Sequence, residues 1–575
     1  MKDGKMSGAE ALVKCLENED VEYIFGLSGG AALPIFDALV DAKIRLILVR
    51  HEQGAVHMAD GYARATGKPG VVLVTSGPGA TNTMTGLLTA HMDSVPIVVL
   101  TGQTITAMLG KDAFQEADVF NTTMPLVKHS YMVRETNTIP RIVREAFHIA
   151  RSGRPGPVLI DLPKDQSAGA FEGDLYPDMD LPGYRLPDEQ PDPADIAAIA
   201  EAFSKSRRPV ILAGQGVLIS GAGEELRALA EKLGAPVTTT LLGKGAFPEN
   251  HALSLGMLGM HGTAYANKAV VECDLIMSVG SRFDDRIIGQ APQFCRDAVR
   301  IHVDVDRGEF GRMIPCDRYC YADARSFLTA LLAHVGSLDT ADWLEQIEAL
   351  KKRYPLTYRK RGGLKMQHIL TALNERMDDD TIIATDVGQH QMWAAQFCKI
   401  DHPRCWLSSG GAGTMGYGFP AAIGAQLGRP NSRVWAVVGD GGFQMTLSEL
   451  ATAAVNKLPV KVIIMNNSYL GMVRQWQTMF YDDRKSGVDL EGNPDFARLA
   501  EAYTGARGFT LRRAGDVKRI LDRAEEVTDG PCIINAIVEK TDNVFPMIPA
   551  GAKLEDMLIR EPKKTEKLEK PTGST

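Results

Sequence analysis

Two kinds of segment alternate along the chain: short runs without polar residues and longer stretches with helical spacing. The run 434–438 (Val-Trp-Ala-Val-Val) is apolar and rich in β-branched residues, which predicts a strand buried on both faces, as in a parallel sheet. Polar and apolar positions then repeat at helical spacing from Thr446 to Val455, and the run 460–465 predicts the next strand. This segment therefore predicts a strand–helix–strand unit.

The same kinds of pattern recur elsewhere in the chain. Strands are predicted over 21–25, 44–49, 70–75, 209–213 and 381–385, with the strand at 44–49 expected to be buried. Helices are predicted over 6–19, 51–65 and 470–480. No internal repeat is visible. The alternation of strands and helices predicts an α/β fold of doubly wound domains with mostly parallel sheets.

A candidate metal site lies at the ends of the two strands described first. Gly439-Asp440-Gly441 follows one strand and Asn466-Asn467 ends the other. Both Asp440 and Asn467 leave the carboxyl ends of their strands, where open α/β sheets bind ligands. A carboxylate and an amide oxygen suit Mg²⁺ carrying a diphosphate. The structural alternative is that Asp440 caps a helix and Asn467 forms a turn.

A second candidate is Glu52, in the stretch His51-Glu52-Gln53-Gly54-Ala55 at the carboxyl end of the strand at 44–49. A zinc site of the H-E-x-x-H type is excluded, because His51 and His57 are six positions apart and point to different sides of a helix. The structural alternative for Glu52 is a salt bridge at the surface. Its position at a strand end favours a role in chemistry.

A weaker signal follows the strand at 209–213, where Gly214-Gln215-Gly216 forms a Gly-x-Gly turn. The full dinucleotide fingerprint needs a third glycine and a later acidic residue, and neither is clearly placed here. By itself this turn does not establish a nucleotide site.

Length and charge limit the remaining classes. The 575 residues suggest roughly three to four domains. A net charge of −8 gives no general attraction to nucleic acid or to an anionic membrane, and the basic cluster at 351–361 is expected to be a solvated helix and linker. No apolar run is long enough for a membrane span, and the first ten residues do not resemble a signal peptide, so a cytoplasmic protein is expected. The eight cysteines form no C-x-x-C pair and are expected to be reduced and mostly buried.

Several stretches resemble the acetohydroxyacid synthase (acetolactate synthase) family of thiamine-diphosphate (ThDP) enzymes, over nearly the whole chain. They are HEQGA (51–55), TSGPGATN (75–82), DAFQEAD (112–118), SGRPGPVLIDLPKD (152–165), and the GDG motif with the Asn pair that follows it. The resemblance implies a biosynthetic catalytic large subunit. Its reaction would decarboxylate pyruvate and transfer the acetaldehyde unit to a second 2-oxo acid, pyruvate or 2-oxobutyrate, in valine, leucine and isoleucine biosynthesis.

Two alternatives remain. One is pyruvate oxidase or another ThDP-dependent 2-oxo acid decarboxylase or carboligase, which the product would distinguish. The other is a non-catalytic FAD- or ThDP-binding regulator, which is disfavoured because several residues that match catalytic positions of the family would then have no use.

The resemblance also implies three domains. A ThDP pyrimidine-binding domain would span 1–170, a central FAD-binding domain 196–340, and a domain for the ThDP diphosphate and Mg²⁺ 366–550. Linkers are expected at 171–195, where five prolines lie among acidic residues, and at 341–365. A C-terminal tail would cover 551–575, disordered from residue 561.

Six residues match catalytic positions of the family. The family's glutamate at the position of Glu52 hydrogen-bonds N1′ of the aminopyrimidine and so activates the cofactor. Gln115, beside Phe114, would lie near the substrate, Gly30, after Gly29, beside the reacting carbon, and Lys164 at the channel mouth. Arg286 would bind the carboxylate of the second 2-oxo acid, and Trp476 would form the wall of its pocket. Ser28 and Ile105 stand where the family usually has proline, which leaves the shape of the entrance open.

The remaining matches concern cofactors and partners. Met415 would hold ThDP in its bent form, although a methionine in the core is the commoner role, and His390 has a packed histidine as its alternative. The segment Arg282-Phe283-Asp284-Asp285-Arg286 favours the biosynthetic branch, because the catabolic enzymes lack both it and the flavin. A homodimer or tetramer with sites between subunits is implied, and a small regulatory subunit is a plausible partner. The implied ligands are Asp440, Asn467 and the carbonyl of Tyr469 for Mg²⁺; Gln389, His390, Gly439, Asp440, Gly441 and Gly442 for the ThDP diphosphate; and Arg154, Gly214, Gly216, His261, Gly262, Arg282, Asp284, Asp285, Asp304 and Asp323 for a structural, non-redox FAD.

Overall fold

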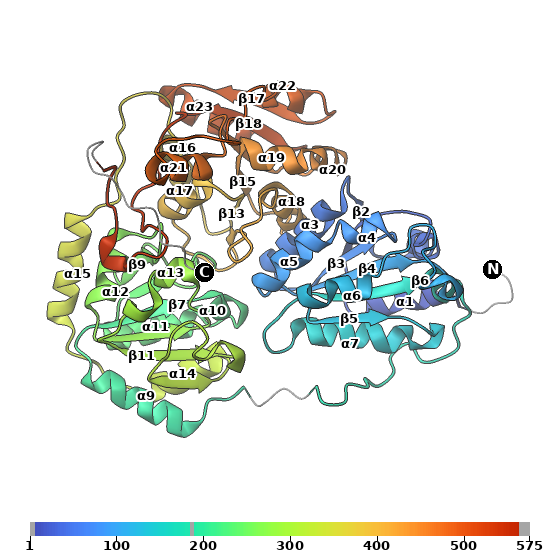
Figure 1. Cartoon of the computed structure of the whole chain (residues 1–575), viewed down its shortest axis with the longest axis horizontal. Helices are drawn as coiled ribbons and strands as arrows, with labels where there is room; N and C mark the ends of the chain where they lie inside the picture. Colours follow the sequence, from blue (N-terminus) through green and yellow to red (C-terminus); the bar gives the residue numbers. More distant parts are fainter. Residues whose placement is uncertain (1–5, 185–188, 563–575) are drawn as a thin grey trace.

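The computed structural model describes residues 6–184 and 189–562. These residues form three α/β domains, each built on a six-stranded parallel sheet (Figure 1). In Figure 1 the N-terminal domain lies on the right, the middle domain at the lower left and the C-terminal domain at the top. The three doubly wound domains with parallel sheets are as predicted.

The N-terminal sheet has the strand order β2-β1-β3-β4-β6-β5, with helices on both faces. The helices α1 and α7 cover one face, and α3 and α5 cover the other. Its strands are β1 (Tyr23–Leu27), β2 (Arg45–Leu48), β3 (Gly70–Val74), β4 (Ile97–Gln103), β5 (His129–Met132) and β6 (Val158–Pro163). Its helices are α1 (Gly8–Asn18), α2 (Leu33–Ala38), α3 (Glu52–Thr66), α4 (Pro78–Thr81), α5 (Met84–Met92), α6 (Val119–Thr123), α7 (Ile139–Arg151) and α8 (Lys164–Ala168).

One strand of this domain differs from the expectation. The strand predicted at 44–49 was expected to be buried, whereas β2 is an edge strand in which Ile47 alone is fully buried. An edge strand pairs on one side only, so its outer positions remain accessible within this chain.

The middle sheet reverses its direction of strand addition between β7 and β10, in the order β12-β11-β10-β7-β8-β9. This is the order of doubly wound dinucleotide-binding sheets, which bind ligands where the order reverses. Its strands are β7 (Pro209–Ala213), β8 (Val237–Thr239), β9 (Ser254–Met257), β10 (Leu275–Val279), β11 (Val299–Asp304) and β12 (Arg318–Tyr321). Its helices are α9 (Pro193–Lys205), α10 (Gln215–Ile219), α11 (Gly223–Leu233), α12 (Ala264–Glu272), α13 (Asp285–Ile288), α14 (Ala324–His334) and α15 (Ala341–Arg353).

The C-terminal sheet, β14-β13-β15-β16-β18-β17, repeats the strand order of the N-terminal sheet. The chain therefore contains a repeat of topology that its sequence does not reveal. The strands are β13 (Ile382–Thr385), β14 (Trp406–Leu407), β15 (Val434–Gly439), β16 (Lys461–Asn466), β17 (Arg507–Leu511) and β18 (Cys532–Ile537). The helices are α16 (Met366–Asn374), α17 (Gln389–Phe397), α18 (Gly418–Gly428), α19 (Asp440–Thr446), α20 (Leu450–Val455), α21 (Gly471–Phe480), α22 (Phe496–Glu501) and α23 (Val517–Glu525).

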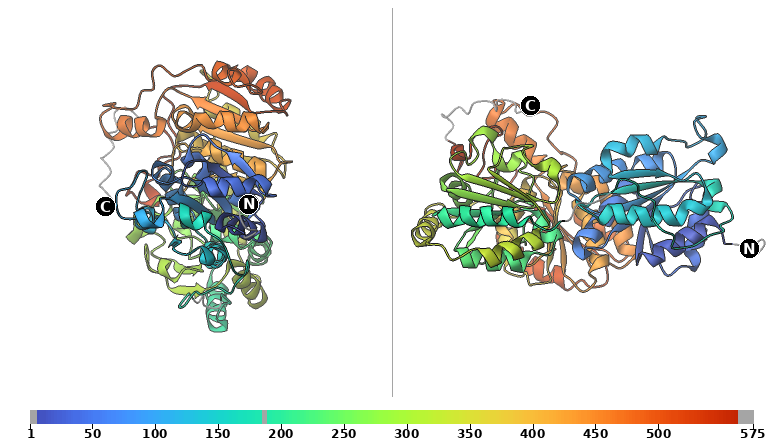
Figure 2. Two further views of the ribbon diagram at one scale, coloured as in Figure 1. Left: turned by 90° about the vertical axis from the view of Figure 1, so that its right-hand side faces the viewer. Right: turned by 90° about the horizontal axis from the view of Figure 1, so that it is seen from below.

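The N- and C-terminal domains share one hydrophobic core, because α3 of the first packs against α18 of the second. The two helices cross through glycines. A methyl group at Gly61 would lie 2.0 Å from the Ala421 carbonyl oxygen, and one at Gly424 would lie 1.8 Å from that of Met58. The two backbones approach too closely for any side chain at these positions. Figure 2, seen from below, shows the N-terminal and middle domains at opposite ends of the molecule.

Three segments expected to be linkers or tail need comment. The described part of 171–192 contains no helix or strand, as expected, and α9 begins at Pro193. Residues 341–353 were expected to open a linker but form α15, which packs on the middle domain with Trp343 and Ile347 buried. In the expected tail, Leu554 of the short 3₁₀-helix η9 (Leu554–Asp556) is buried in the same core. Residues 563–575, most of the segment expected to be disordered, lie outside the described residues.

All eight cysteines are free thiols, and seven are buried, as expected. Across 6–184 and 189–562, no helix combines the length and apolar character needed to cross a membrane.

Candidate active site and cofactor cavity

The proposed Mg²⁺ ligands lie at the ends of two paired strands, β15 and β16. Gly439 is the N-cap of α19 and Asp440 is its first residue, so the Asp440 side chain is not the helix cap that the structural alternative requires. Asn493 Nδ2 donates to Asp440 Oδ2 at 2.7 Å. Burial raises the pKa of Asp440 to about 6. A buried carboxylate in this position gains most from a cation close by.

Asn467 forms the turn of the structural alternative and also contacts Gln389 beside the proposed site. Its Oδ1 accepts a hydrogen bond from the Tyr469 backbone N–H at 3.1 Å, which is the turn of the structural alternative. Its Nδ2 lies 3.5 Å from Gln389 Oε1. Among the described residues no three His, Cys, Asp or Glu side chains cluster as metal ligands. A cation here would therefore depend on Asp440 with amide and carbonyl oxygens, a donor set that fits Mg²⁺.

The cradle proposed for a diphosphate lies where a helix begins. Gln389 is the first residue of α17, whose N-terminal N–H groups favour anions. His390 is buried beside Gly439, and burial lowers the pKa of its imidazole to about 3, so the ring is neutral. Its Nε2 is buried without a hydrogen-bond partner in the described part of the chain. Such an orphaned polar atom in a glycine-lined cradle fits a site for a polar ligand.

Met415 lies next to this cradle. Its methyl group would be 3.5 Å from a Cβ at Gly441, and its side chain is half-buried and not part of the core. Asp386 accepts hydrogen bonds from the N–H groups of Gly416 at 3.0 Å and Gly418 at 3.2 Å. The loop that carries Met415 is thereby fixed on its C-terminal side.

Glu52 is the first residue of α3 and only 7% exposed. Asn82 Nδ2 donates to its Oε2 at 2.9 Å, and no cation pairs with it among the described residues, so the surface salt bridge of the structural alternative is wrong. Gly30 faces open space, and the backbone of Gln115 packs against Gly77. Phe114 is 89% exposed, and Lys164 is half-buried at the start of α8.

A cavity of about 660 Å³ lies between the three domains. It covers the point where the middle sheet reverses, since Gly216 on α10 and Gly280 after β10 both line it. Their backbones touch: a Cβ at Gly216 would be 2.6 Å from Gly280 Cα. The cavity thus has the position and the close backbone approach of a dinucleotide site. The predicted residues that line it are Arg154, Gly216, His261, Arg282, Asp284, Arg286, Asp304, Asp323 and Trp476.

Three residues expected to bind FAD do not line this cavity. Gly214 packs its backbone against Gly280, and Gly262 packs against the backbone of Met257 and Leu258. The Asp285 side chain is 57% exposed. The two glycines thus shape the surrounding loops, and Asp285 faces away.

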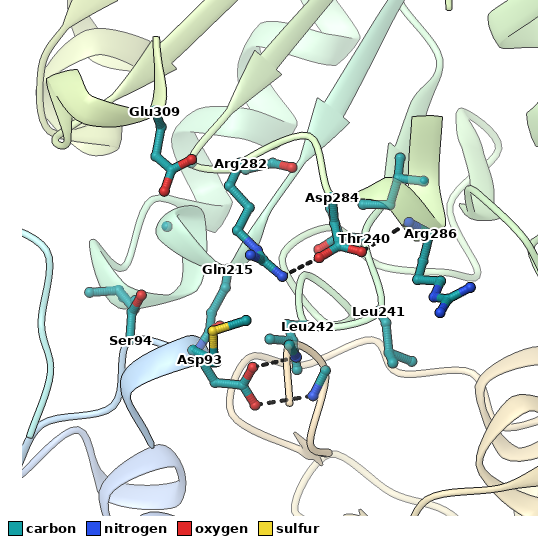
Figure 3. A pocket seen from close by; sticks show the side chains of 18 of the residues that line it. Asp93, Ser94, Gln215, Thr240, Leu241, Leu242, Arg282, Asp284, Arg286 and Glu309 are labelled. Atoms are coloured by element: carbon teal, nitrogen blue, oxygen red, sulfur yellow. Dashed lines mark hydrogen bonds and ion pairs between the residues drawn. The ribbon is translucent and has the colours of Figure 1, made fainter. Parts of the chain in front are cut away.

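The acidic residues of the cavity serve partly as helix caps. Asp323 accepts from the N–H groups of Arg325 and Ser326 at the start of α14. Asp284 caps α13 by accepting from the Arg286 N–H at 2.9 Å and pairs with the Arg282 guanidinium (Figure 3). Burial raises the pKa of Asp304 to about 6.

Arg154 connects the N-terminal domain to this cavity. Its guanidinium lies 2.6 Å from Glu309 Oε1 and 3.2 Å from Asp306 Oδ2, and its Nε donates to Ser94. Glu309 and Ser94 also line the cavity and were not expected from the sequence.

Arg286 and Trp476 line the same cavity although they come from different domains. The Arg286 side chain is 60% exposed and turned away from Asp284 in Figure 3, with its Nε 3.6 Å from Asp285 Oδ2. The ring centroids of Trp476 and Phe480 lie 5.1 Å apart. Trp476 is only half-buried, so it is not simply a core residue. Their shared cavity is compatible with one substrate touching both.

The comparisons with known proteins agree over all three domains. The chain matches the thiamine pyrophosphate enzyme N-terminal TPP binding domain at 6–122, the central domain at 196–331 and the C-terminal TPP binding domain at 386–536. An acetolactate synthase of Mycobacterium bovis is 46% identical over 96% of this chain and 91% of its own length. The chain belongs to the acetolactate synthase family.

Members of the acetolactate synthase family are similar to it from end to end. A probable acetolactate synthase large subunit of Methanocaldococcus jannaschii is 46% identical, over 98% of this chain and 97% of its own. An acetolactate synthase large subunit of Lactococcus lactis is 44% identical over 96% of both. The chain is thus a ThDP-dependent enzyme, as the sequence predicted.

Apart from the acetolactate synthase motifs, the structure contains a buried cluster of polar residues that was not predicted from the sequence. Asp60, Arg64, Asp93 and Tyr417 connect the N- and C-terminal domains next to the Met415 loop. The only available signal was the Asp60/Arg64 pair, four positions apart on a helix otherwise rich in small and apolar residues.

Proposed function

We propose that this chain is the catalytic large subunit of an acetolactate synthase. It would join two 2-oxo acids with loss of carbon dioxide: two pyruvates give 2-acetolactate, and pyruvate with 2-oxobutyrate gives 2-aceto-2-hydroxybutyrate. The supporting observation is end-to-end similarity to acetolactate synthase large subunits. A cytoplasmic location and a role in branched-chain amino-acid biosynthesis accompany this proposal.

ThDP, when bound, supplies the electron sink that a 2-oxo acid needs for decarboxylation. The chain would hold its diphosphate through Mg²⁺ on Asp440, Asn467 and the Tyr469 carbonyl, with Gln389 and His390 alongside. Glu52 would hold a proton at the aminopyrimidine nitrogen. Its Oε2 is already occupied by Asn82, which leaves Oε1 for this contact. Burial favours that role because few waters compete for the carboxylate.

The acceptor would be held by Arg286, whose planar guanidinium can donate two parallel hydrogen bonds to a carboxylate. Trp476, on the same cavity, would contact its alkyl group. Gln115, Gly30 and Lys164 would line the approach from the N-terminal domain.

FAD would occupy the large cavity as a structural group. A volume of about 660 Å³ at the reversal of a dinucleotide-type sheet, with Arg154 entering from another domain, supports this assignment. If FAD were instead reduced by substrate, the oxidase alternative would apply. Flavin absorbance that stays constant while pyruvate is consumed supports the structural role.

The functional enzyme would be a homodimer or tetramer. Glu52 and the proposed diphosphate cradle belong to different domains, and Glu52 accepts a hydrogen bond from Asn82 of its own domain. In the family, the two parts of one site come from different subunits. Large apolar side chains are exposed on this chain, among them Phe114 (89%), Val455 (72%) and Met445 (57%), as expected of surfaces that pair. The small regulatory subunit of the family is a plausible further partner.

The decisive experiment is to supply the purified protein with pyruvate, ThDP and Mg²⁺ and to identify the product. Formation of 2-acetolactate supports the proposal. Acetaldehyde, or acetate with oxidant consumption, would favour the decarboxylase or oxidase alternative.

The metal assignment has a separate test. Asp440→Ala should weaken ThDP binding, measured by titration at fixed Mg²⁺, because the diphosphate charge is no longer neutralised. A titration identical to that of the unmodified protein would remove Asp440 from the site.

A further inference from the structure

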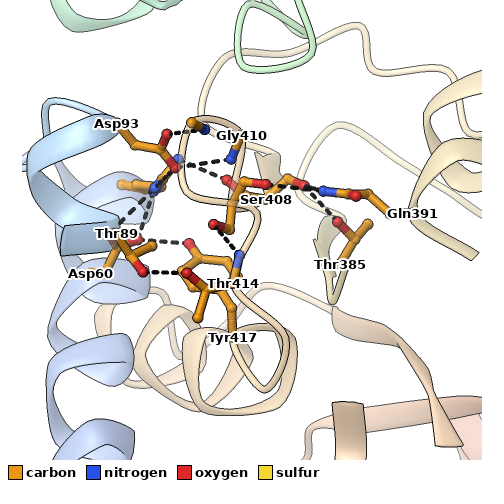
Figure 4. A network of polar contacts seen from close by, with 12 residues as sticks. Asp60, Thr89, Asp93, Thr385, Gln391, Ser408, Gly410, Thr414 and Tyr417 are labelled. Atoms are coloured by element: carbon orange, nitrogen blue, oxygen red, sulfur yellow. Dashed lines mark hydrogen bonds and ion pairs between the residues drawn. The ribbon is translucent and has the colours of Figure 1, made fainter. Parts of the chain in front are cut away.

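The loop 408–417, which runs from β14 to α18, carries Met415 and is held by side chains of another domain. Asp93, directly after α5, accepts hydrogen bonds from the N–H groups of Gly410 at 3.1 Å and Gly411 at 2.7 Å (Figure 4). The Thr414 hydroxyl lies 2.6 Å from that of Thr89 on α5. Residues 410–414 of this loop are therefore placed by the N-terminal domain.

Asp93 is itself fixed by a buried ion cluster. Arg64 Nη2 donates to Asp93 at 2.8 Å, Arg64 Nε donates to Asp60 at 2.6 Å, and Arg64 Nη1 donates to the Ser408 carbonyl at 3.0 Å. The side chains of Asp60 and Asp93 are 0% exposed and that of Arg64 is 8% exposed. All three groups lie at the junction of α3, α5 and the loop.

The charges of this cluster do not balance. Two carboxylates face one guanidinium, so one negative charge must be stabilised by dipoles. The dipoles available are the N–H groups of Gly410 and Gly411 on Asp93 and the hydroxyl of Tyr417 on Asp60, at 2.6 Å. All of them belong to the loop 408–417. The buried charge and the loop conformation therefore depend on each other.

The loop separates the two proposed cofactor regions. Asp93, Gly410, Gly411 and Gly413 line the large cavity, whereas Met415 lies against Gly441 of the diphosphate cradle. Beyond Met415, Asp386 holds Gly416 and Gly418. Met415 thus sits between two carboxylate anchors, Asp93 from the N-terminal domain and Asp386 from its own domain.

We propose that Asp93 is a positioning residue that fixes the loop 408–417 and thereby places Met415 against ThDP. This proposal rests on the proposed function, in which ThDP binds beside Met415. Asp93 acts through the loop backbone and is not expected to touch the substrate.

The test uses Asp93→Asn, which keeps the side-chain shape but replaces one acceptor oxygen with a donor that neither glycine N–H can use. Hydrogen exchange of the peptide 408–417 should become at least about tenfold faster, because its amides lose their charged acceptor. The dissociation constant for ThDP, titrated at fixed excess Mg²⁺, should rise about tenfold, as is typical when an outer positioning group is removed.

Asp274→Asn is the matched control. Asp274 accepts from the N–H groups of Arg207 at 2.8 Å and Arg208 at 3.0 Å in the middle domain, so it loses the same kind of contact far from the loop. This variant should accelerate exchange around 206–208 and leave ThDP affinity unchanged.

Gly411→Ala provides a second variant if Asp93→Asn folds poorly. Its methyl group would lie 2.9 Å from Met92 Cβ and should displace the loop from Asp93 without altering any buried charge. Weaker ThDP binding is expected again. Unchanged exchange at 408–417 and unchanged ThDP affinity in a folded variant would overturn the proposal. If the unmodified protein failed to bind ThDP, the proposed function would fail instead, while the exchange experiment would still report on the Asp93 contact.

Discussion

At the scale of single residues, Glu52 combines burial with a carboxylate oxygen, Oε1, to which none of the described residues donates a hydrogen bond. Its neighbour Asn82 orients the carboxylate through Oε2, and α3 begins at Glu52 itself. The remaining oxygen, Oε1, is the one available to a partner such as the proposed aminopyrimidine nitrogen.

Replacing Glu52 should therefore affect activation more than binding. In Glu52→Gln, exchange of the thiazolium C2 proton should slow by about 100-fold or more, because an amide cannot take part in the proton transfer. The measurement is proton–deuterium exchange of bound ThDP followed by NMR after acid quench. ThDP affinity serves as the internal control and should remain largely intact. Exchange at the unmodified rate would exclude Glu52 from this role.

Arg286 and Trp476 should influence the acceptor in different ways. Both acceptors carry the carboxylate, so Arg286→Lys should depress the use of both by weakening a two-pronged contact. The acceptors differ by one methylene, which a hydrophobic pocket distinguishes by only about 1–3 kcal/mol. Trp476→Leu should erode the preference for 2-oxobutyrate with turnover retained. The product ratio in competition between pyruvate and 2-oxobutyrate measures both effects.

An unchanged product ratio in Trp476→Leu would show that another side chain forms the pocket wall. For Arg286→Lys, an equal loss of both products with an unchanged ratio would support the proposed contact with the acceptor carboxylate.

Glu52 and Asp440 could be proposed from the sequence because they lie at strand ends, and Trp476 because it matches the family's tryptophan. Asp93 could not. Its partner Arg64 is 29 positions away, and the Arg64 contact to Ser408 spans 344 positions. No local pattern specifies a charge cluster that forms only when two domains meet.

At the scale of elements, the crossing of α3 and α18 depends on the absence of side chains at Gly61 and Gly424. Sequence periodicity predicted α3 as a helix but not its partner, because the partner follows from how the domains pack. At α15 a solvated helix and a linker were expected around the basic run at 351–353, whereas the helix begins at Ala341 and buries Trp343 and Ile347. Whether a segment forms a helix is encoded locally, whereas the element that the helix packs against is not.

Gly424→Ala should destabilise the protein although alanine is the better helix former. The methyl group would meet the Met58 carbonyl at 1.8 Å, and overpacking of this kind costs about 1–3 kcal/mol. Gly223→Ala in α11 is the control, since its methyl group would meet the nearest atom at an ordinary 3.4 Å. Thermal unfolding should show a lower midpoint for Gly424→Ala and an unchanged or higher one for the control. Equal midpoints would mean that α3 and α18 can separate without cost.

At the scale of the whole molecule, the buried histidines and the buried Asp161 change the stability in opposite directions as the pH changes. Burial lowers the pKa of His57 and His390 to about 3, and of His261 and His302 to about 4. Burial also raises the pKa of Asp161 to about 7. The histidines cost stability as the pH falls, whereas Asp161 costs stability as the pH rises, so the sum partly cancels.

His57 allows one of these contributions to be isolated. An unfolded histidine titrates near 6.5 and folded His57 near 3, so between these values the unfolded chain binds the extra proton, and stability is lost as the pH falls from about 6.5. His57→Gln cannot titrate. From pH 7 to pH 5 it should lose about 2 kcal/mol less stability than the unmodified protein. Urea unfolding at pH 5, 6, 7 and 8 tests this, and parallel pH curves would contradict it.

The pairing of α3 with α18 also has a consequence for synthesis on the ribosome. Each sheet uses one continuous stretch of chain, so the N-terminal domain can fold before the others emerge. Its helix α3 ends at Thr66, whereas α18 is complete only at Gly428. At typical elongation rates, synthesis of the chain from the end of α3 to the end of α18 takes about 20–70 s. During that interval the apolar side chains that α3 buries in the shared core, among them Val56, Met58 and Tyr62, lack the α18 side of that core.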